Sequence, residues 1–393
     1  MISKLLELRT KEILNIIRER NNISRVELAK LTGLSKPTVS MIVNNLIDEG
    51  IIKENGLGSS RKTGGRRPIK LSFISDYKYV LSVDIGGTKT IIALIDLEGA
   101  IHKVDIIPSE QINTIRGIEK EIVSRLKSFL MDIENRKILS ICIGVPGTVD
   151  RKKQIVKFIP SFNLEELDLK TPLERVFNIP VLIENDVTLA AYGESWIGSA
   201  KNYEDALLVS IGTGVGAGIV MGNVVYKGYT GSAGEIGEMI TDWSSEFKRI
   251  SSFGKLEEWF SGYSLEDFCI EKGMEKNLPV LFEKMKDDEN INKRIIEGCV
   301  HLALAFANSI ILLDPAKIII GGGIGFNQYE QIFPIINETL VKALPKAIYR
   351  SDILDKAALE PYSVVIGGAY FAQKELLLGS ICNIFNKKME VQK

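Results

Sequence analysis

The stretch ISRVELAKLTGLSKPTVSMIVNNLIDEGII, residues 23–52, indicates how the first part of this chain folds. Ser24 followed by Glu27 has the capping-box spacing that begins a helix, and a short turn around Gly33 ends that helix. A second helix begins after Ser35, a favourable N-cap residue. Two helices joined by a glycine turn form the helix-turn-helix pattern, whose second helix enters the DNA major groove. A generic helical hairpin has the same pattern, so that alternative stays open at this point.

The outward face of the second helix carries short hydrogen-bonding side chains. Such groups suit base edges and phosphates. The predicted DNA contacts on this helix are Ser35, Lys36, Thr38, Ser40, Asn44 and Asn45.

Two predicted strands follow, at 51–54 and 68–73, with a glycine-rich loop at 56–65 between them. This arrangement is a β-wing, and it favours a winged helix-turn-helix over a generic hairpin. The segment Gly64–Pro68 is compact and cationic, so it can enter a narrow A·T-rich minor groove. The predicted DNA contacts of the wing are Arg61, Lys62, Arg66 and Arg67.

Charge is distributed unevenly along the 393 residues, although the formal net charge is only -1. Residues 1–70 carry 14 Lys and Arg against 7 Asp and Glu, a net charge of +7, and the remainder carries 35 against 43, a net charge of -8. A basic head on an acidic body favours a polyanionic partner for the head. Solvated helix faces are the alternative explanation.

Three glycine turns adjoin apolar segments in the body. The first, Gly86–Lys89, joins strands predicted at 80–84 and 90–96, and the second and third are 212–218 and 321–323. Backbone N–H groups of such turns can approach phosphate oxygens closely. Two further apolar segments rich in small residues, 141–147 and 364–372, act as connectors between these units.

The ordered set resembles the actin-like ATPase fold of sugar kinases, and the head with its GGRRP wing resembles that of the ROK family (repressors, open reading frames, kinases). The resemblance implies an α/β protein with a winged helix-turn-helix over 1–75 and a two-lobed, ribonuclease-H-like sugar-kinase domain over 78–393. Lobe 1 is expected over about 78–190 plus the C-terminal helix, and lobe 2 over about 200–365.

The stretch ENDVTLAAYGE, residues 184–194, matches the ROK sugar site. By that resemblance Asn185 binds the sugar, Asp186 is the general base of a kinase, and Glu235 and Glu257 accept from sugar hydroxyls. The alternative role of Asp186 is to cap its helix. The resemblance also implies nucleotide contacts, with Asp84 holding Mg²⁺: Asp84, Gly86, Gly87, Thr88, Lys89, Gly212, Thr213, Gly214, Gly321, Gly322 and Gly323.

One part of the family pattern is missing. ROK kinases bind a structural zinc ion through a histidine and three cysteines, and here Glu238 replaces that histidine. The cysteine positions hold Lys248, Ile250 and Lys255. The two histidines of the chain, His102 and His301, are distant in sequence and are expected to lie away from this segment.

A zinc site requires about four nitrogen or sulfur ligands, so we predict no bound zinc. The segment 243–253 is then expected to be mobile or held by aromatic packing through Trp243, Phe247 and Phe253.

Three functions remain open from the sequence. The first is a sugar-responsive transcriptional regulator, a repressor of xylose-type carbohydrate genes, which binds a double-stranded DNA operator and a small sugar as a homodimer or homotetramer. The second is an ATP- and Mg²⁺-dependent sugar kinase, alone or in a bifunctional protein. The third is a DNA-binding scaffold with an inert body.

The chain is predicted to be cytoplasmic, with no membrane partner. Arg9, Lys11 and Glu12 interrupt any early apolar core of a signal peptide. The uncharged stretch 206–226 has the length of a membrane span but is rich in glycine, which favours a buried β-hairpin. Three of the four cysteines lie in apolar runs and are expected to be buried thiols.

Overall fold

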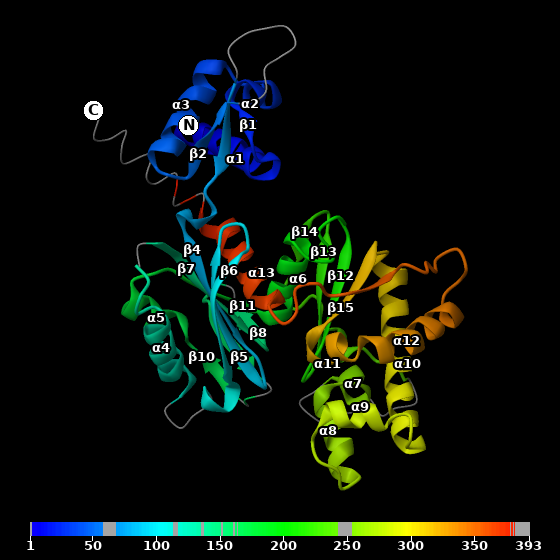
Figure 1. Cartoon of the computed structure of the whole chain (residues 1–393). Coiled ribbons are helices and arrows are strands. Elements are labelled where there is room, and N and C mark those ends of the chain that lie inside the picture. Colours follow the sequence, from blue (N-terminus) through cyan, green and yellow to red (C-terminus); the bar gives the residue numbers. More distant parts are fainter. Residues whose placement is uncertain are drawn as a thin grey trace.

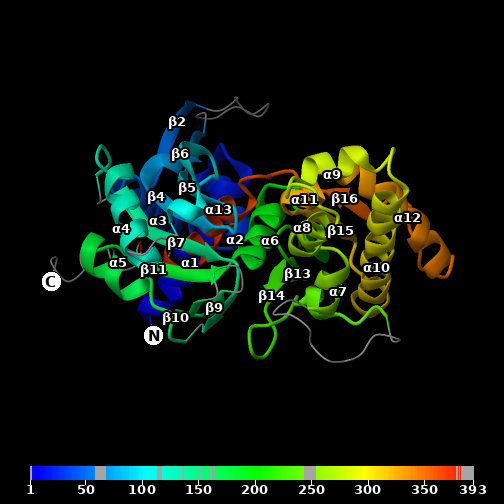
Figure 2. The ribbon, with the colours of Figure 1, turned by 90° about the horizontal axis from the view of Figure 1, so that it is seen from below.

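The computed structural model describes residues 2–57, 68–112, 117–134, 137–150, 152–159, 162, 164–242, 254–377, 379 and 381. A small head of helices and strands stands on a larger body with two lobes (Figure 1). Seen from below, the two lobes lie beside each other with helix α6 between them (Figure 2).

The head is a winged helix. Its elements are α1 (Ile2–Arg20), β1 (Ile23–Ser24), α2 (Arg25–Thr32), α3 (Lys36–Asp48), β2 (Ile52–Leu57) and β3 (Ile69–Phe73). The strands pair antiparallel in the order β1-β3-β2. The predicted capping box between Ser24 and Glu27 is confirmed, and so is the Ser35 cap of α3. Gly33 and Gly50 have positive φ angles of 67° and 72°, which favour glycine after a helix.

Lobe 1 contains a five-stranded sheet in the order β11-β7-β4-β5-β6, and a small sheet in the order β10-β9-β8. The large sheet consists of β4 (Tyr79–Ile85), β5 (Lys89–Asp96), β6 (Ile101–Pro108), β7 (Ile138–Val145) and β11 (Val181–Asn185), and the small one of β8 (Thr148–Asp150), β9 (Ile155–Ile159) and β10 (Leu164–Leu167). Helices α4 (Ile118–Phe129) and α5 (Lys170–Phe177) accompany them.

Lobe 2 repeats this design. Its sheet has the order β14-β13-β12-β15-β16, and consists of β12 (Ala206–Ile211), β13 (Val215–Met221), β14 (Val224–Tyr226), β15 (Lys317–Gly321) and β16 (Leu354–Lys356). In both lobes the first three strands are antiparallel and the last two are parallel. The helices are α7 (Lys255–Trp259), α8 (Gly262–Glu271), α9 (Leu278–Lys284), α10 (Glu289–Leu313), α11 (Gly322–Asn327) and α12 (Tyr329–Ala343).

Two sequence expectations about the glycine-rich strands are confirmed. The first glycine turn joins β4 to β5 as an antiparallel hairpin, and the stretch 206–226 forms hairpins of β12, β13 and β14. The third turn differs from the other two. Strand β15 ends at Gly321, and the chain continues into helix α11 rather than into a returning strand. Gly322, which has a φ of 79°, begins that helix.

Helices α6 (Asp186–Trp196) and α13 (Ser363–Ala372) pack against each other at the junction of the lobes. Helix α13 also contacts β4, β5 and β7 of lobe 1, while α6 contacts β12 and β13 of lobe 2. A Cβ on Gly367 would overlap the carbonyl oxygen of Leu189, so glycine permits this close crossing. The predicted connector 364–372 is therefore a helix, and it is apolar on every side because lobe 1 and α6 bury it.

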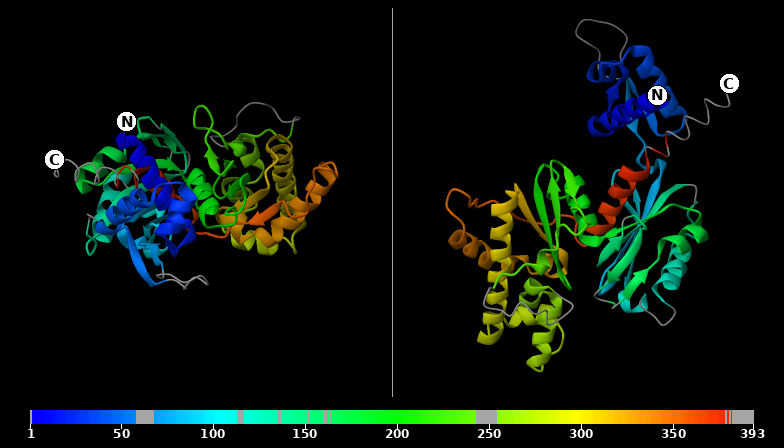
Figure 3. Two further views of the ribbon diagram at one scale, coloured as in Figure 1. Left: turned by 90° about the horizontal axis from the view of Figure 1, so that it is seen from above. Right: turned by 180° about the vertical axis from the view of Figure 1, so that it is seen from behind.

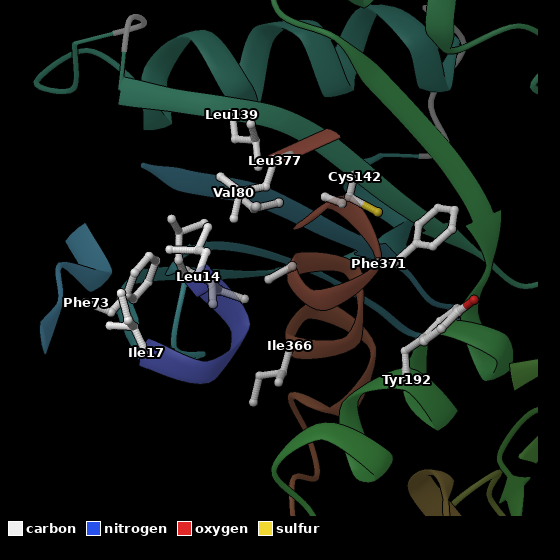
Figure 4. Packing of buried hydrophobic residues seen from close by; sticks show 14 of the residues in the cluster. Leu14, Ile17, Phe73, Val80, Leu139, Cys142, Tyr192, Ile366, Phe371 and Leu377 are labelled. Atoms are coloured by element: carbon white, nitrogen blue, oxygen red, sulfur yellow. The ribbon is translucent and has the colours of Figure 1, made fainter. Parts of the chain in front are cut away.

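The core of the head continues into the body. Leu14 and Ile17 of α1 belong to the same buried cluster as Val80 of β4 and Leu377 beyond α13. Figure 4 shows Leu14 and Ile17 pointing toward Phe73 and the body. From behind, α13 rises from the lobe junction toward the head (Figure 3). Head and body are thus joined by packing as well as by the chain.

Helix α10 is the one helix, among the described residues, that is long and apolar enough to cross a membrane, and 56% of its most apolar window is buried inside the protein. It packs on α12 and α7 as a core helix. Cys142, Cys269 and Cys299 are buried free thiols, as expected.

Candidate functional site

A pocket opens where the two lobes meet. Lobe 1 contributes the segment after β7, the end of β11 and the first turn of α6, and lobe 2 contributes β13 and the segment 231–235. The lining residues are Gly147, Thr148, Val149, Glu184, Asn185, Val187, Thr188, Gly216, Ala217, Gly231, Ala233, Gly234 and Glu235. Asn185 and Glu235, two of the four predicted sugar contacts, therefore line one cavity.

Asn185 is fixed by its neighbours at the start of α6. Its Oδ1 accepts from the N–H of Thr188 at 2.9 Å, and its Nδ2 donates to the carbonyl of Gly147 at 3.2 Å and to Oδ1 of Asp186 at 3.1 Å. The capping residue of α6 is thus Asn185, and the suggestion that Asp186 caps this helix is wrong. Asp186 is the first residue inside the helix, one position after the residue that caps it.

Asp186 is the carboxyl at this site whose pKa lies near neutrality. Burial raises its pKa to about 7, and the negative charge of Glu235 adds to this, while hydrogen bonds from the N–H groups of Val187 and of Asp186 itself oppose it. Oδ1 accepts from Val187 N at 2.8 Å. A carboxyl with a pKa near neutrality exchanges its proton readily, as a general base requires.

The other two predicted acceptors differ. Burial and the nearby charges of Glu257 and Glu238 raise the pKa of Glu235. Glu257 does not line the pocket; its Oε1 accepts from Val215 N at 2.7 Å and its Oε2 accepts from Gly254 N, at the start of α7, at 2.8 Å. Its carboxylate therefore joins β13 to α7 beside Glu235.

The residues predicted for a nucleotide converge on the same region. Burial and the charges of Asp186 and Glu360 raise the pKa of Asp84 well above its usual range, and Lys89 lowers it. Gly212 and Gly323 of the second and third turns are neighbours. Inside the first turn, Gly86 N donates to the carbonyl of Lys89.

Glu360 is a residue that sequence reasoning missed. Its Oε1 accepts from the N–H of Gly322 at 2.7 Å, inside the third glycine turn. Buried Glu194 fixes the chain around it, since its carboxylate accepts from Ala358 N, Leu359 N and the Ser363 hydroxyl. Glu360 belongs to no motif, so only the fold reveals that it reaches this turn.

Glu184 and Lys227 were also missed. Lys227 Nζ lies 2.6 Å from Glu184 Oε2, and the Glu184 side chain is only 4% exposed. The pair joins β11 of lobe 1 to the segment after β14 of lobe 2, and Glu184 lines the pocket.

The expectation that both histidines lie away from residues 238–255, which hold the positions of the missing zinc ligands, is wrong for His301. Its Nδ1 is 2.7 Å from the hydroxyl of Thr241, and its ring stacks on Trp259 at 3.9 Å between centroids. Helix α10 carries His301 back beside this segment, a contact that sequence distance hides. Residues 243–253, including the three aromatic residues predicted to hold that segment, lie outside the described residues, and the rest of the described chain brings no three His, Cys, Asp or Glu side chains into metal-binding proximity.

The predicted DNA-binding residues of α3 are exposed or half-buried, and three of them already make side-chain hydrogen bonds within the head. Ser35, Lys36 and Asn44 are exposed, and Thr38, Ser40 and Asn45 are half-buried. Ser35 Oγ contacts Thr38 Oγ1 at 2.8 Å, and Asn44 Oδ1 accepts from Arg25 at 3.0 Å. Met41, at 46% exposure on the same face, was not predicted. Arg61, Lys62, Arg66 and Arg67 of the wing lie outside the described residues.

A winged helix joined to a two-lobed sugar-kinase fold defines a class of DNA-binding regulators. A winged helix-turn-helix DNA-binding domain matches residues 6–53 and a ROK family domain matches residues 80–375. The chain belongs to the ROK family.

Named relatives share this organisation. The chain is 34% identical over 284 residues to the xylose repressor of Bacillus subtilis (strain 168), covering 72% of this chain and 71% of that protein. It is 24% identical over 388 residues to the DNA-binding transcriptional dual regulator NagC of Escherichia coli (strain K12), covering 95% and 94%.

Solved structures show the same fold. A ROK family transcriptional regulator, a homologue of the E. coli MLC protein, superposes with a TM-score of 0.81 at 24% identity and covers 96% of this chain and 99% of that one. A ROK family glucokinase from Streptomyces griseus, in complex with glucose and AMPPNP, superposes with a TM-score of 0.63 at 24% identity, covering 75% and 99%.

Proposed function

We propose that this protein is a sugar-responsive transcriptional repressor that binds operator DNA through residues 1–75 and a small sugar in the cleft of residues 78–393. The observation that carries the proposal is the continuous core between α1 and the lobe 1 sheet, because it connects the pocket-bearing body mechanically to the DNA-binding head. The repressor names of the relatives support it. A cytoplasmic homodimer or homotetramer suits a palindromic operator.

The sugar is proposed to occupy the lined pocket. The side-chain oxygen of Asn185 and the carboxyl of Glu235 line the pocket and offer acceptors to sugar hydroxyls, and Asp186 follows Asn185 directly at its wall. Glu257 would support Glu235 rather than touch the sugar itself. The xylose repressors among the relatives make D-xylose the first sugar to test.

The test begins with a thermal-shift screen of aldoses and N-acetylated sugars on the full-length protein. Saturation at about 100 times the dissociation constant should stabilise the native state by about 2.7 kcal/mol. Operator affinity is then measured by fluorescence anisotropy, using a duplex that the protein selects from a random pool. A sugar that stabilises the protein should weaken this affinity by about 5- to 150-fold. Operator affinity unchanged by every stabilising sugar contradicts the proposal.

A second function, an ATP-dependent sugar kinase, is favoured by the pKa of Asp186 near 7. Asp84, Lys89 and the glycine turns would hold ATP and Mg²⁺, although the Glu360 carboxylate already takes the N–H of Gly322. An ADP-release assay with the sugar panel separates the two functions. Turnover that Asp186→Asn abolishes establishes a kinase, and the absence of turnover with a sugar-dependent operator affinity establishes a regulator alone.

A further inference from the structure

We propose that Lys227 transmits occupancy of the pocket to the DNA-binding head, a regulatory role that rests on the sugar response proposed above. The Lys227 side chain lies between the pocket and helix α13, and the chain that continues α13 contacts the head. Three sets of contacts carry the proposal, one at the pocket, one at α13 and one at the head.

At the pocket, Lys227 holds two walls at once. Its Nζ donates to Oε2 of Glu184 at 2.6 Å, and its carbonyl oxygen accepts from Ala233 N at 3.2 Å. Glu184 lines the pocket from lobe 1, and Ala233 lines it from lobe 2. Any change in the separation of these walls therefore acts on Lys227.

A bound sugar competes directly for the partner of Lys227. Glu184 Oε1 accepts from Asn185 N at 3.1 Å and Oε2 accepts from Lys227, so a sugar hydroxyl that donates to this carboxylate weakens its attraction for Lys227. A half-buried ammonium that loses its carboxylate must find another partner or more water, because an unpaired buried charge is strongly disfavoured. Sugar binding thus displaces or rotates the Lys227 side chain.

At α13, the same ammonium faces aromatic rings. Lys227 Nζ lies 4.5 Å from the ring centroid of Phe371 and 5.4 Å from that of Tyr192. These two rings stack at 5.5 Å, and Figure 4 shows them side by side. Cation–π attraction depends on the position of the cation over the ring. Displacement of Lys227 therefore changes the force on the C-terminal end of α13.

At the head, the residues just after Phe371 contact α1. Gln373 Oε1 accepts from Arg18 Nη2 at 2.7 Å, and Gln373 is buried. Its Nε2 is a buried donor without a partner within the described part of the chain, which makes this docked arrangement easier to shift. Lys374 lies between the two regions, with its Nζ 5.5 Å from the ring centroid of Tyr192. Burial lowers its pKa, the charge of Glu375 raises it, and the charges of Lys11 in the head and Lys227 at the pocket lower it.

The test compares four full-length variants with the wild type. Lys227→Met keeps the aliphatic side chain and removes the charge, and Lys227→Arg keeps the charge. Gln373→Ala removes the contact with the head at a residue that does not line the pocket. Lys201→Met is the matched control, because Lys201 is exposed in the turn region after α6. D-xylose binding is measured by calorimetry, and affinity for the selected duplex by anisotropy with and without D-xylose.

In the wild type, D-xylose, or the stabilising sugar that the screen identifies in its place, should weaken DNA binding by about 5-fold or more; an affinity unchanged by every stabilising sugar refutes the proposed function itself. Where the wild type responds, Lys227→Met and Gln373→Ala should each reduce the sugar-induced loss of operator affinity to less than about 2-fold. Lys227→Arg and Lys201→Met should keep most of the wild-type loss. Retention of the wild-type factor by Lys227→Met overturns the role of Lys227. If Lys227→Met no longer binds D-xylose, the response of Gln373→Ala is the deciding measurement. A wild-type loss of operator affinity in Gln373→Ala overturns the proposed route from the pocket through α13 to the head.

Discussion

Arg18 is expected to hold the head against the body, and Arg18→Met should loosen that docking. The guanidinium donates to the carbonyl of Leu97 at 2.6 Å and to Gln373 at 2.7 Å, and lies 5.0 Å from the ring centroid of Phe73. Burial lowers the pKa of Arg18, so its charge carries a desolvation cost that offsets part of these contacts.

The magnitude follows from these contacts. Two hydrogen bonds from a charged group contribute about 1.5–3 kcal/mol each, whereas the cation–π contact with Phe73 of β3 lies within the head and does not add to docking. After the desolvation offset, the substitution should cost about 2–4 kcal/mol of docking free energy. That corresponds to about a 30- to 1,000-fold rise in the population of the undocked head, since each 1.36 kcal/mol is a factor of ten.

Hydrogen exchange measured by mass spectrometry is the appropriate assay, because a multidomain chain does not unfold in two states. Peptides covering α1 and 373–377 should exchange faster by that factor in Arg18→Met, while those covering α10 stay unchanged. Arg20→Met on the same helix is the control, because Arg20 is exposed. Exchange in Arg18→Met within about threefold of wild type, or equal acceleration in Arg20→Met, refutes the reasoning.

Three further predictions concern the pocket, its protonation and the DNA interface. Asn185→Ala should cost about 1 kcal/mol of stability, measured by chemical denaturation, because it removes the cap of α6, and it should also weaken sugar binding measured by calorimetry. The control Asn277→Ala removes the cap of α9; it should cost as much stability but leave the sugar affinity unchanged. Asp186 has its pKa raised from 3.8 to about 7, so the native state holds a proton that the unfolded state releases; its stabilising effect is present below pH 4 and lost as the pH rises from about 4 to 7. The stability of wild type relative to Asp186→Asn, from urea midpoints, should therefore fall across that window, and a constant difference contradicts the raised pKa. Lys36→Ala should reduce the slope of operator affinity against salt concentration by about 0.9 if Lys36 contacts one phosphate, and an unchanged slope excludes that contact.

The sequence predicted the elements whose signals are local. The Ser24 and Ser35 caps, the Gly33 turn and the β4–β5 hairpin each depend on residues a few positions apart, and the structure confirms them. The pairing of Asn185 and Glu235 around one pocket came from resemblance to a family motif, since nothing in their spacing fixes it.

The contacts that were missed join distant positions. Arg18 meets Gln373 across 355 residues, His301 meets Thr241 across 60, and Glu360 meets Gly322 across 38. Single polar residues of this kind carry no periodicity, and their partners become evident only when the two sheets and α13 are in place. The helical structure of the predicted connector 364–372 was not evident from the sequence for a related reason, because a helix buried on every side has no amphipathic pattern.

One sugar and operator DNA are expected to bind to this chain with opposing effects. The decisive quantity is the affinity for D-xylose, and for any other sugar that stabilises the protein, with and without saturating operator duplex. The operator should weaken binding of the effector sugar by the same factor, about 5- to 150-fold, by which the sugar weakens operator binding. Sugar affinity that is identical with and without bound operator contradicts this expectation.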